Sequence, residues 1–219
     1  MSESIGREFM RKTYYPQVPE SAQRQGLPQP PLELPYPAEA PLIDLPDPGE
    51  CKILAQDLRK VIEERVSVRN YSGQPLTLAE LSFLLWATQG VKTVTKRPVT
   101  LRTVPSAGAR HPFETYLLVN QVEGLEPGLY RYVAIEHGLL RLEAAEDIND
   151  RITKACLDQA QVRTSAVTFI WVAVTERMMW RYPERGYRYL HLDAGHVCQN
   201  LYLAAGVVGC GVCGIAAFD

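Results

Sequence analysis

Residues 102–114 read RTVPSAGARHPFE, and this stretch decides more about the chain than any other. Two prolines restrict the backbone at their own positions, and the glycine between them relaxes it. The residues from Ser106 to Ala109 carry almost no side chain, so a flat ligand could lie directly against the backbone. Arg102, Arg110 and His111 flank this bare segment with hydrogen-bond donors. An ordinary surface turn that enters a strand has the same residue types, so the rest of the chain has to separate the two interpretations.

Composition places the chain among ordinary globular proteins. Its 219 residues suit one domain, with or without a long arm. Hydrophobic residues make up 46% and charged residues 22%, so a sizeable core can form. The formal net charge is -2 and no basic block occurs. We therefore expect neither nucleic acid nor an anionic membrane as the main partner.

The N-terminus and the cysteines indicate a cytoplasmic protein. Residues 1–10 carry charged side chains and no apolar run, so we expect no signal peptide. No run of about 18 apolar residues, the length that spans a bilayer, is found in the sequence. The five cysteines are odd in number and unevenly spaced, which is typical of free thiols in a reducing compartment.

The first 48 residues differ in composition from the rest. They hold 10 of the 16 prolines, and proline at this density disfavours helices and sheet ladders. Leucines and an isoleucine are interleaved with the prolines, which indicates an extended arm that packs along a surface. We therefore divide the chain into a proline-rich arm, residues 1–48, and a folded domain, residues 49–219.

Hydrophobic periodicity predicts helices over residues 51–66, 77–90, 148–161 and 186–208. The second begins with a capping box formed by Thr77 and Glu80, and it should stop at Gly90. Residues 91–104 are polar and basic, so we expect a loop there. The last helix is apolar around most of its circumference, which predicts burial in a large core or in an oligomer interface.

Segments rich in β-formers predict strands over residues 113–120, 128–133 and 139–143, with a turn near His137 and Gly138. The apolar run over 166–175 predicts a central strand buried on both faces. Residues 209–218 are small and strand-like. Because helices and strands alternate irregularly, the predicted fold class is α+β rather than doubly wound α/β.

Two clusters of arginine could carry chemistry. Arg65, Ser67 and Arg69 place two planar donor forks around a hydroxyl, which suits a phosphate or carboxylate, although a basic helix end has the same pattern. Residues 180–189 read WRYPERGYRY, in which arginines and tyrosines alternate densely. This segment suits a cavity mouth that stacks on and orients a planar ligand, or an exposed loop with aromatic anchors.

Two further motifs favour structural roles. Asp193 and His196 could bond across one turn of the last helix, but together with His191 they give no recognised ligand spacing, so we expect no metal. Cys210 and Cys213 have a Cys-x-x-Cys spacing without a second pair or a helix start. This favours small buried packing residues.

Taken in order, five of these segments resemble the FMN-dependent nitroreductase superfamily, and most closely its SagB/ThcOx-type branch of azoline dehydrogenases. The matching segments are 65–73, 76–90, 102–112, 181–201 and 209–219. The resemblance implies a nitroreductase-like α+β fold, with a central, mostly antiparallel sheet flanked by helices. It also implies an intertwined homodimer with FMN at the subunit interface. The family continues past the segment that ends at Asp219, so the domain would lack the last C-terminal strand.

By this resemblance, the phosphate, the ribityl chain and the pyrimidine edge of FMN would be held by Arg65, Ser67 and Arg69. Two sets of residues would flank the isoalloxazine ring: Pro105, Ser106, Ala107 and Gly108 on one side, and Gly214, Ile215, Ala216 and Ala217 near N5 on the other. The protein would supply position and electrostatics while the cofactor carries the electrons.

The family pattern also bears on the reaction. Azoline dehydrogenases carry a lysine–tyrosine pair where this chain has Arg181 and Tyr182, and an arginine stays protonated, so it does not readily act as a base. We expect Tyr182 to donate a proton near the flavin and Arg181 to bind and orient. The expected function is that of an FMN-dependent oxidoreductase that reduces a small electrophile, such as a quinone or nitro compound, with electrons from NAD(P)H. An azoline dehydrogenase acting on a modified peptide and an inactive flavin-binding protein are the alternatives.

Overall fold

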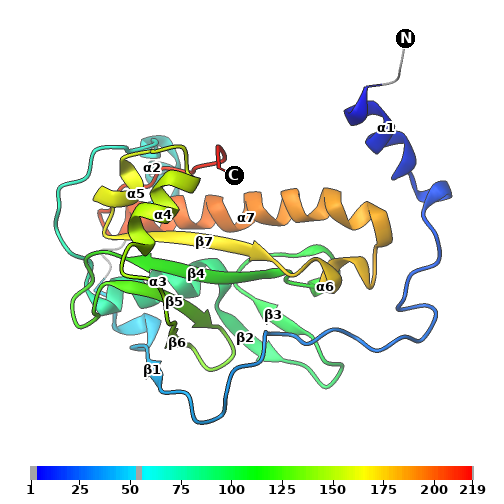
Figure 1. The fold of residues 1–219 in the computed structure, drawn as a ribbon, viewed down its shortest axis with the longest axis horizontal. Helices are drawn as coiled ribbons and strands as arrows, with labels where there is room; N and C mark the ends of the chain where they lie inside the picture. The colour runs from blue at the N-terminus through cyan, green and yellow to red at the C-terminus, as the bar shows by residue number, and fades with distance from the viewer. Residues whose placement is uncertain (1–3, 53–55, 219) are drawn as a thin grey trace.

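The computed structural model describes residues 4–52 and 56–218. Within them, five strands form an antiparallel sheet in the order β1-β6-β5-β4-β7, and β2 and β3 form a second sheet. The strands are β1 Leu42–Asp44, β2 Val91–Val94, β3 Thr100–Arg102, β4 Phe113–Val119, β5 Gly128–Val133, β6 Gly138–Arg141 and β7 Val167–Ala173. The α-helices are α1 Ile5–Lys12, α2 Leu58–Glu64, α3 Leu78–Gln89, α4 Ile148–Ala155, α5 Gln161–Thr164, α6 Thr175–Met179 and α7 Gly186–Val207. Short 3₁₀ turns occupy Tyr15–Gln17, Pro48–Glu50, Ala107–Ala109 and Pro183–Arg185. The predicted α+β class, with an antiparallel sheet flanked by helices, is confirmed (Figure 1).

The main core lies between the five-stranded sheet and helices α3 and α7 (Figure 1). Leu81 and Leu85 of α3, Leu117 of β4 and Leu139 of β6 are fully enclosed. Burying an apolar side chain of this size contributes about 1.5–3 kcal/mol, so this layer supplies much of the stability of the domain. The same layer fixes the position of α7 in the domain.

The local signals around α3 and the β5–β6 turn are confirmed. The hydroxyl of Thr77 accepts the backbone N–H of Glu80 at 3.2 Å, and the carboxylate of Glu80 accepts the N–H of Thr77 at 2.8 Å. The helix ends at Gln89, directly before Gly90. The turn contains His137, whose φ of +53° lies in the left-handed region.

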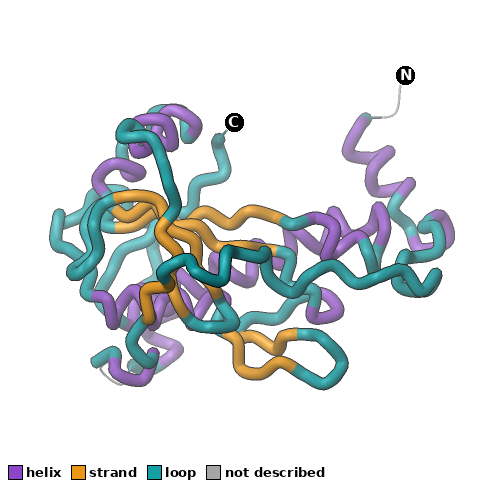
Figure 2. Tube along the Cα trace, turned by 60° about the horizontal axis from the view of Figure 1, so that its bottom comes forward, coloured by secondary structure: helices purple, strands orange, loops and turns teal. Residues whose placement is uncertain are grey.

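Two predictions about strands were wrong. Residues 91–104 do not form a loop, because β2 and β3 pair as a hairpin that projects from the body (Figure 2). Its β-branched residues favour a strand, and its lysines suit a solvated edge. The apolar run over 166–175 does form β7, but β7 lies at the edge of the sheet rather than in its centre. Val172 is 45% exposed, so β7 is not buried on both faces in one chain.

Three predicted elements are shorter than expected. The helix over 51–66 is reduced to α2, which Asp57 caps by accepting the N–H of Arg59 at 2.9 Å; residues 53–55 lie outside the described residues. The helix over 148–161 is split into α4 and α5, because Leu157 and Asp158 have positive φ values of 53° and 56°. Residues 209–218 contain one isolated bridge, between Ser67 and Val212.

The arm forms two regular elements, a helix and a paired strand, that its proline content disfavours. Helix α1 precedes Pro16, so no proline interrupts it. Strand β1 lies between Pro41 and Pro46 and pairs with β6 at an edge of the sheet, where flanking prolines are tolerated. Between these two elements the arm runs along the domain (Figure 2).

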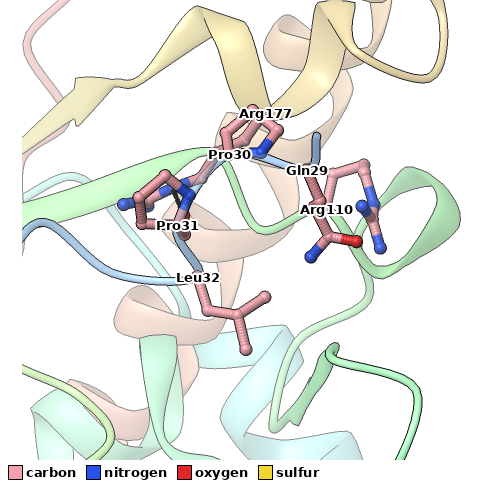
Figure 3. Close-up of a pocket in the computed structure, with 6 residues that line it drawn as sticks. All are labelled: Gln29, Pro30, Pro31, Leu32, Arg110 and Arg177. Carbon is pink, nitrogen blue, oxygen red and sulfur yellow. Dashed lines mark hydrogen bonds between the residues drawn. The ribbon is translucent and has the colours of Figure 1, made fainter. Parts of the chain in front are cut away.

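Buried charges hold the middle of the arm in place. Arg177 donates through Nε to the carbonyl of Pro31 at 2.8 Å and pairs with Glu114 at 2.5 Å. Glu114 also accepts the backbone N–H of Leu34 at 2.8 Å. The side chains of Arg177 and Glu114 are 3% and 4% exposed. Figure 3 shows this part of the arm against Arg177 and Arg110, which line one small pocket with it. Without the arm, both members of this buried ion pair would lose a hydrogen-bond partner, and an unsatisfied buried polar group is costly, so we infer that the arm is an integral part of the domain surface.

Candidate functional site

The bare loop at residues 105–108 is fastened to helix α7. The hydroxyl of Ser106 donates to one carboxylate oxygen of Asp193 at 2.6 Å, and the backbone N–H of Ala107 reaches the other at 3.3 Å. The same hydroxyl accepts the N–H of His111 at 2.9 Å. Gly108 has a φ of +59°, a conformation that side chains with a Cβ rarely adopt. These contacts hold the loop in one conformation.

Asp193 anchors the loop, a role that the sequence did not indicate. The predicted bond to His196 is not what fixes its carboxylate, which points to the loop, while His196 is exposed. Burial raises the pKa of Asp193, and the bonds from Ser106 and Ala107 partly oppose that increase. Only the three-dimensional contact reveals this role, because the loop and α7 are 86 residues apart at this point.

Arg181 and Tyr182 lie directly against the loop. A Cβ placed on Gly108 would come within 2.6 Å of the Tyr182 hydroxyl and 2.8 Å of the Arg181 side chain. Arg110 donates through Nε to the carbonyl of the same glycine at 3.0 Å. The structure thus brings together the loop and the arginine–tyrosine pair, two sets of residues that the sequence predicted separately.

The arm supports Tyr182 through a second tyrosine, Tyr189. The two rings meet edge to face, with centroids 4.8 Å apart. The hydroxyl of Tyr189 accepts Nε–H of Arg185 at 2.8 Å and lies 3.2 Å from the hydroxyl of Tyr15 in the arm. Arg185 also donates to the carbonyl of Thr13 at 2.9 Å. The arm therefore forms part of the wall around Tyr182, a contact that no local sequence pattern indicated.

A second cluster gathers around Tyr202 of α7. Its hydroxyl lies 3.0 Å from that of Ser67 and accepts the backbone N–H of Gly214 at 2.8 Å. The guanidinium of Arg65 lies over the Tyr202 ring, 5.4 Å from its centroid. Arg69 is exposed on the same segment. The structure thus brings the predicted phosphate-binding residues next to the start of the predicted C-terminal set.

The remaining predicted residues lie at the margins of these clusters. Pro105 and Ala216 are exposed, and Ile215 is half-buried. The carbonyl of Ala217 accepts Nε2–H of Gln159 at 3.1 Å, which holds the end of the chain near α5. All five cysteines are free thiols, and Cys210 and Cys213 are half-buried. None of the interactions between described residues joins the loop at 105–108 to the segment at 214–217.

The two clusters point to opposite sides of helix α7. Asp193 and Tyr202 are nine residues apart in that helix, which amounts to a rise of about 13 Å and a rotation of about 180°. Consequently a flat ligand lying on one side of α7 cannot contact both clusters of one chain.

Two classes of site find no support in the described parts of the chain. Across residues 4–52 and 56–218, no three His, Cys, Asp or Glu side chains gather where they could hold a metal ion. None of the described helices, α7 included, combines the length and the apolar character that crossing a bilayer requires.

Comparison with known proteins identifies the family. The family model described as Nitroreductase family matches residues 62–219. "Putative nitroreductase MJ1384" from Methanocaldococcus jannaschii is 39% identical over 176 residues, which is 80% of this chain and 84% of that protein. The chain therefore belongs to the nitroreductase family and is an oxidoreductase.

Two more comparisons bear on the branch and the fold. "Trifolitoxin-processing protein TfxB" from Rhizobium leguminosarum bv. trifolii is 37% identical over 112 residues, 49% of this chain and 30% of that protein, and this match supports the predicted SagB-type branch. A crystal structure from Anabaena variabilis, also described as a nitroreductase, superimposes with a TM-score of 0.62 at 32% identity. That match covers 74% of this chain but only 33% of the Anabaena chain, so this chain spans about a third of it.

Proposed function

We propose that the protein is a homodimeric, FMN-dependent oxidoreductase that reduces a small electrophile, such as a quinone or nitro compound, with electrons from NAD(P)H. The observation that carries this proposal is the division of the site between two sides of α7. In a two-fold dimer, the Arg65 cluster of one copy and the loop of the other can face the same cofactor. Within a single chain, the Arg65 cluster and the loop lie on opposite sides of α7, so they cannot hold the same cofactor.

The cluster around Tyr202 fits the polar end of FMN. A phosphate needs several donors with few competing acceptors, and arginine supplies a planar fork. Arg65 and Arg69 are exposed, and neither forms an ion pair with a carboxylate in the described part of the chain. The Ser67 hydroxyl lies between them in the sequence and is held by Tyr202. These residues would hold the phosphate and the ribityl chain.

The loop fits the flat end of the cofactor. Ser106 and Ala107 turn their polar groups toward Asp193, which leaves the exposed Pro105 and the small side chains of the loop to contact a ring. When bound, FMN supplies the electron transfer. Tyr182 would donate a proton to the acceptor, Arg181 would orient it, and the segment from Gly214 to Ala217 would line the other side of the ring.

A flavin titration and a mass measurement test this proposal. Purified protein should bind FMN, with absorbance near about 450 nm that belongs to the cofactor, and should sediment as a dimer at micromolar concentration. Colourless protein that takes up no FMN would contradict the cofactor assignment. A monomer that binds FMN would contradict the division of the site between two copies.

Rapid-mixing kinetics test the role of Tyr182. The variant Tyr182→Phe should slow reduction of the acceptor by about 10- to 1,000-fold if its hydroxyl donates a proton in the transition state. Reduction of the enzyme by NAD(P)H is measured in parallel. If Tyr182→Phe leaves both half-reactions unchanged, Tyr182 is only a wall of the pocket.

A peptide azoline dehydrogenase is the second candidate, favoured by the match to a trifolitoxin-processing protein. Against it, Arg181 stands where that branch carries a lysine, and arginine remains protonated. We expect the natural protein to leave a thiazoline peptide unchanged while it reduces a quinone or nitroaromatic. Oxidation of the peptide would reverse the order of the two candidates. The five free thiols are consistent with a reducing, cytoplasmic setting for either reaction.

A further inference from the structure

Two arginines contact Gly108 from different directions. Arg110 donates to its carbonyl at 3.0 Å, and the aliphatic and Nε atoms of Arg181 lie 2.8 Å from where a Cβ would stand. Each guanidinium also lies over an aromatic ring, at 5.2 Å for Arg110 over Trp180 and 5.5 Å for Arg181 over Tyr182. Two positive charges therefore lie close to one glycine of the loop.

These charges lack carboxylate partners. In the described residues, the ion pairs involve Lys12, Lys60, Arg163 and Arg177, and none involves Arg110 or Arg181. The nearest carboxylate attached to the loop belongs to Asp193, and it already accepts Ser106 and Ala107. Burial and the positive charges of Arg181 and Arg97 lower the pKa of Arg110. The surroundings of Gly108 thus carry positive charge that the protein does not neutralise by pairing.

We propose that Arg181 and Arg110 form an anion subsite, so that the electron acceptor carries a carboxylate or similar anionic group beside its electrophilic atom. This inference rests on the proposed function. Arg181 is half-buried and can contact the acceptor, whereas Arg110 is 6% exposed and contributes through its charge. An anion beside Tyr182 would be held at the residue proposed to donate the proton, which would bring the electrophile and the donor together.

A matched pair of nitro compounds tests the subsite by equilibrium binding. Flavin-loaded, full-length protein is titrated by calorimetry, without an electron donor, with 4-nitrobenzoate and with 4-nitrobenzamide, which differ mainly in charge. We expect the benzoate to bind at least about 10-fold more tightly, the effect of one hydrogen bond to a charged group. Raising the salt concentration should shrink this preference, because salt screens exposed charges.

Three variants assign the preference to its residues. Arg181→Gln should reduce the preference for the benzoate by about 10-fold, and Arg181→Lys, which keeps the charge, should retain most of it. Arg163→Gln removes an exposed arginine of α5 that pairs with Asp150 at 3.0 Å, and it should leave the preference unchanged. The rate of enzyme reduction by NAD(P)H is measured on each variant as well.

Several results would overturn the inference. Equal affinity for the two compounds in the natural protein would show that there is no anion subsite. A preference that persists in Arg181→Gln would show that Arg181 does not form it. An effect of Arg181→Gln on reduction by NAD(P)H alone would place the anion on the electron donor instead. Protein that takes up no FMN would overturn the proposed function together with this inference. Protein that takes up FMN but shows no anion preference would overturn the inference alone.

Discussion

Around the loop at 105–108 the polar contacts are partly buried, whereas around Arg65 and Arg69 they are exposed. Asp193, which holds the loop, is 3% exposed. The other cluster depends on the hydroxyl of Tyr202 and leaves its arginines in solvent. The first cluster is thus held by partly buried contacts, while the second keeps its donors available for a ligand. Substitutions in the two halves should therefore separate stability from ligand affinity.

The largest effect is expected at Gly108. Gly108→Ala introduces a Cβ at a φ of +59° that would lie 2.6 Å from the Tyr182 hydroxyl. The backbone conformation and the close contact together should cost about 3 kcal/mol. Gly124→Ala is a matched control, because Gly124 has a φ of +79° but open space where its Cβ would stand. Chemical denaturation of both variants measures the difference, and equal losses would mean that the loop does not pack tightly against Tyr182.

Acid should destabilise the protein at His111, whose backbone N–H is bonded to Ser106 of the loop. Burial, followed by the positive charges of Arg102 and Arg110, lowers the pKa of His111 to about 3. The unfolded chain takes up this proton below about pH 6.5, so the stability that His111 contributes is lost as pH falls from there toward 3. The loss is at most about 1.4 kcal/mol per pH unit, or roughly 2–3 kcal/mol by pH 4.5.

The measurement for His111 is a difference between two proteins. Asparagine tolerates the positive φ of 42° at this position and does not titrate. The stability of His111→Asn relative to the natural protein should therefore rise as pH falls from 6.5 to 4.5. Burial raises the pKa of Glu33 to about 7, so the contribution of Glu33 to stability increases as pH falls. This effect is the same in both proteins and cancels in the difference. A pH-independent difference would show that His111 titrates normally.

The exposed half should respond in affinity rather than in stability. Replacing Arg65 and Arg69 together by glutamine should weaken FMN binding by about 10- to 100-fold, as expected for lost hydrogen bonds to a charged phosphate. The unfolding free energy should stay within about 0.5 kcal/mol, since surface substitutions away from packed features usually do. Arg59→Gln, on the exposed surface of α2, is the control. If unfolding changes and affinity does not, the comparison between the two halves fails.

The smallest effect is expected where the arm meets the loop half. Tyr15→Phe removes the hydroxyl that lies 3.2 Å from Tyr189 and keeps the ring beneath the Arg185 guanidinium. We expect a loss of about 0.5–1.5 kcal/mol, seen as faster hydrogen exchange in residues 13–17. Tyr14→Phe is the control, because Tyr14 is exposed and its hydroxyl forms no hydrogen bond with another described residue. Identical exchange in both variants would mean that Tyr15 does not anchor the arm.

The sequence predicted those features that depend on local patterns. The capping box of Thr77, the stop at Gly90 and the length of α7 follow from neighbouring residues, and the structure confirms them. The position of β7 was missed, because an apolar run does not indicate how many strands will flank it. The β2–β3 hairpin was missed because the lysines made the segment polar and basic, which outweighed its β-branched residues in the prediction.

The candidate site shows the same limit. Small residues at 105–108 predicted a bare backbone, and the arginine and tyrosine content of 180–189 suited either a cavity mouth or an exposed loop with aromatic anchors. Neither pattern could identify Asp193 as the anchor of the loop, because that role depends on a contact between distant segments. The support of Tyr182 by the arm spans still more of the sequence, since Tyr15 and Tyr189 are 174 residues apart.

The arm's contacts also constrain how the protein is made. Thr13 is held by Arg185 and Arg188, and β1 pairs with residues 138–140. Because domains fold as units during synthesis, the arm is made well before Arg185 and Arg188 and cannot complete these contacts until they have been made. Its prolines suit that delay, since proline-rich segments resist the strand pairing that leads to aggregation.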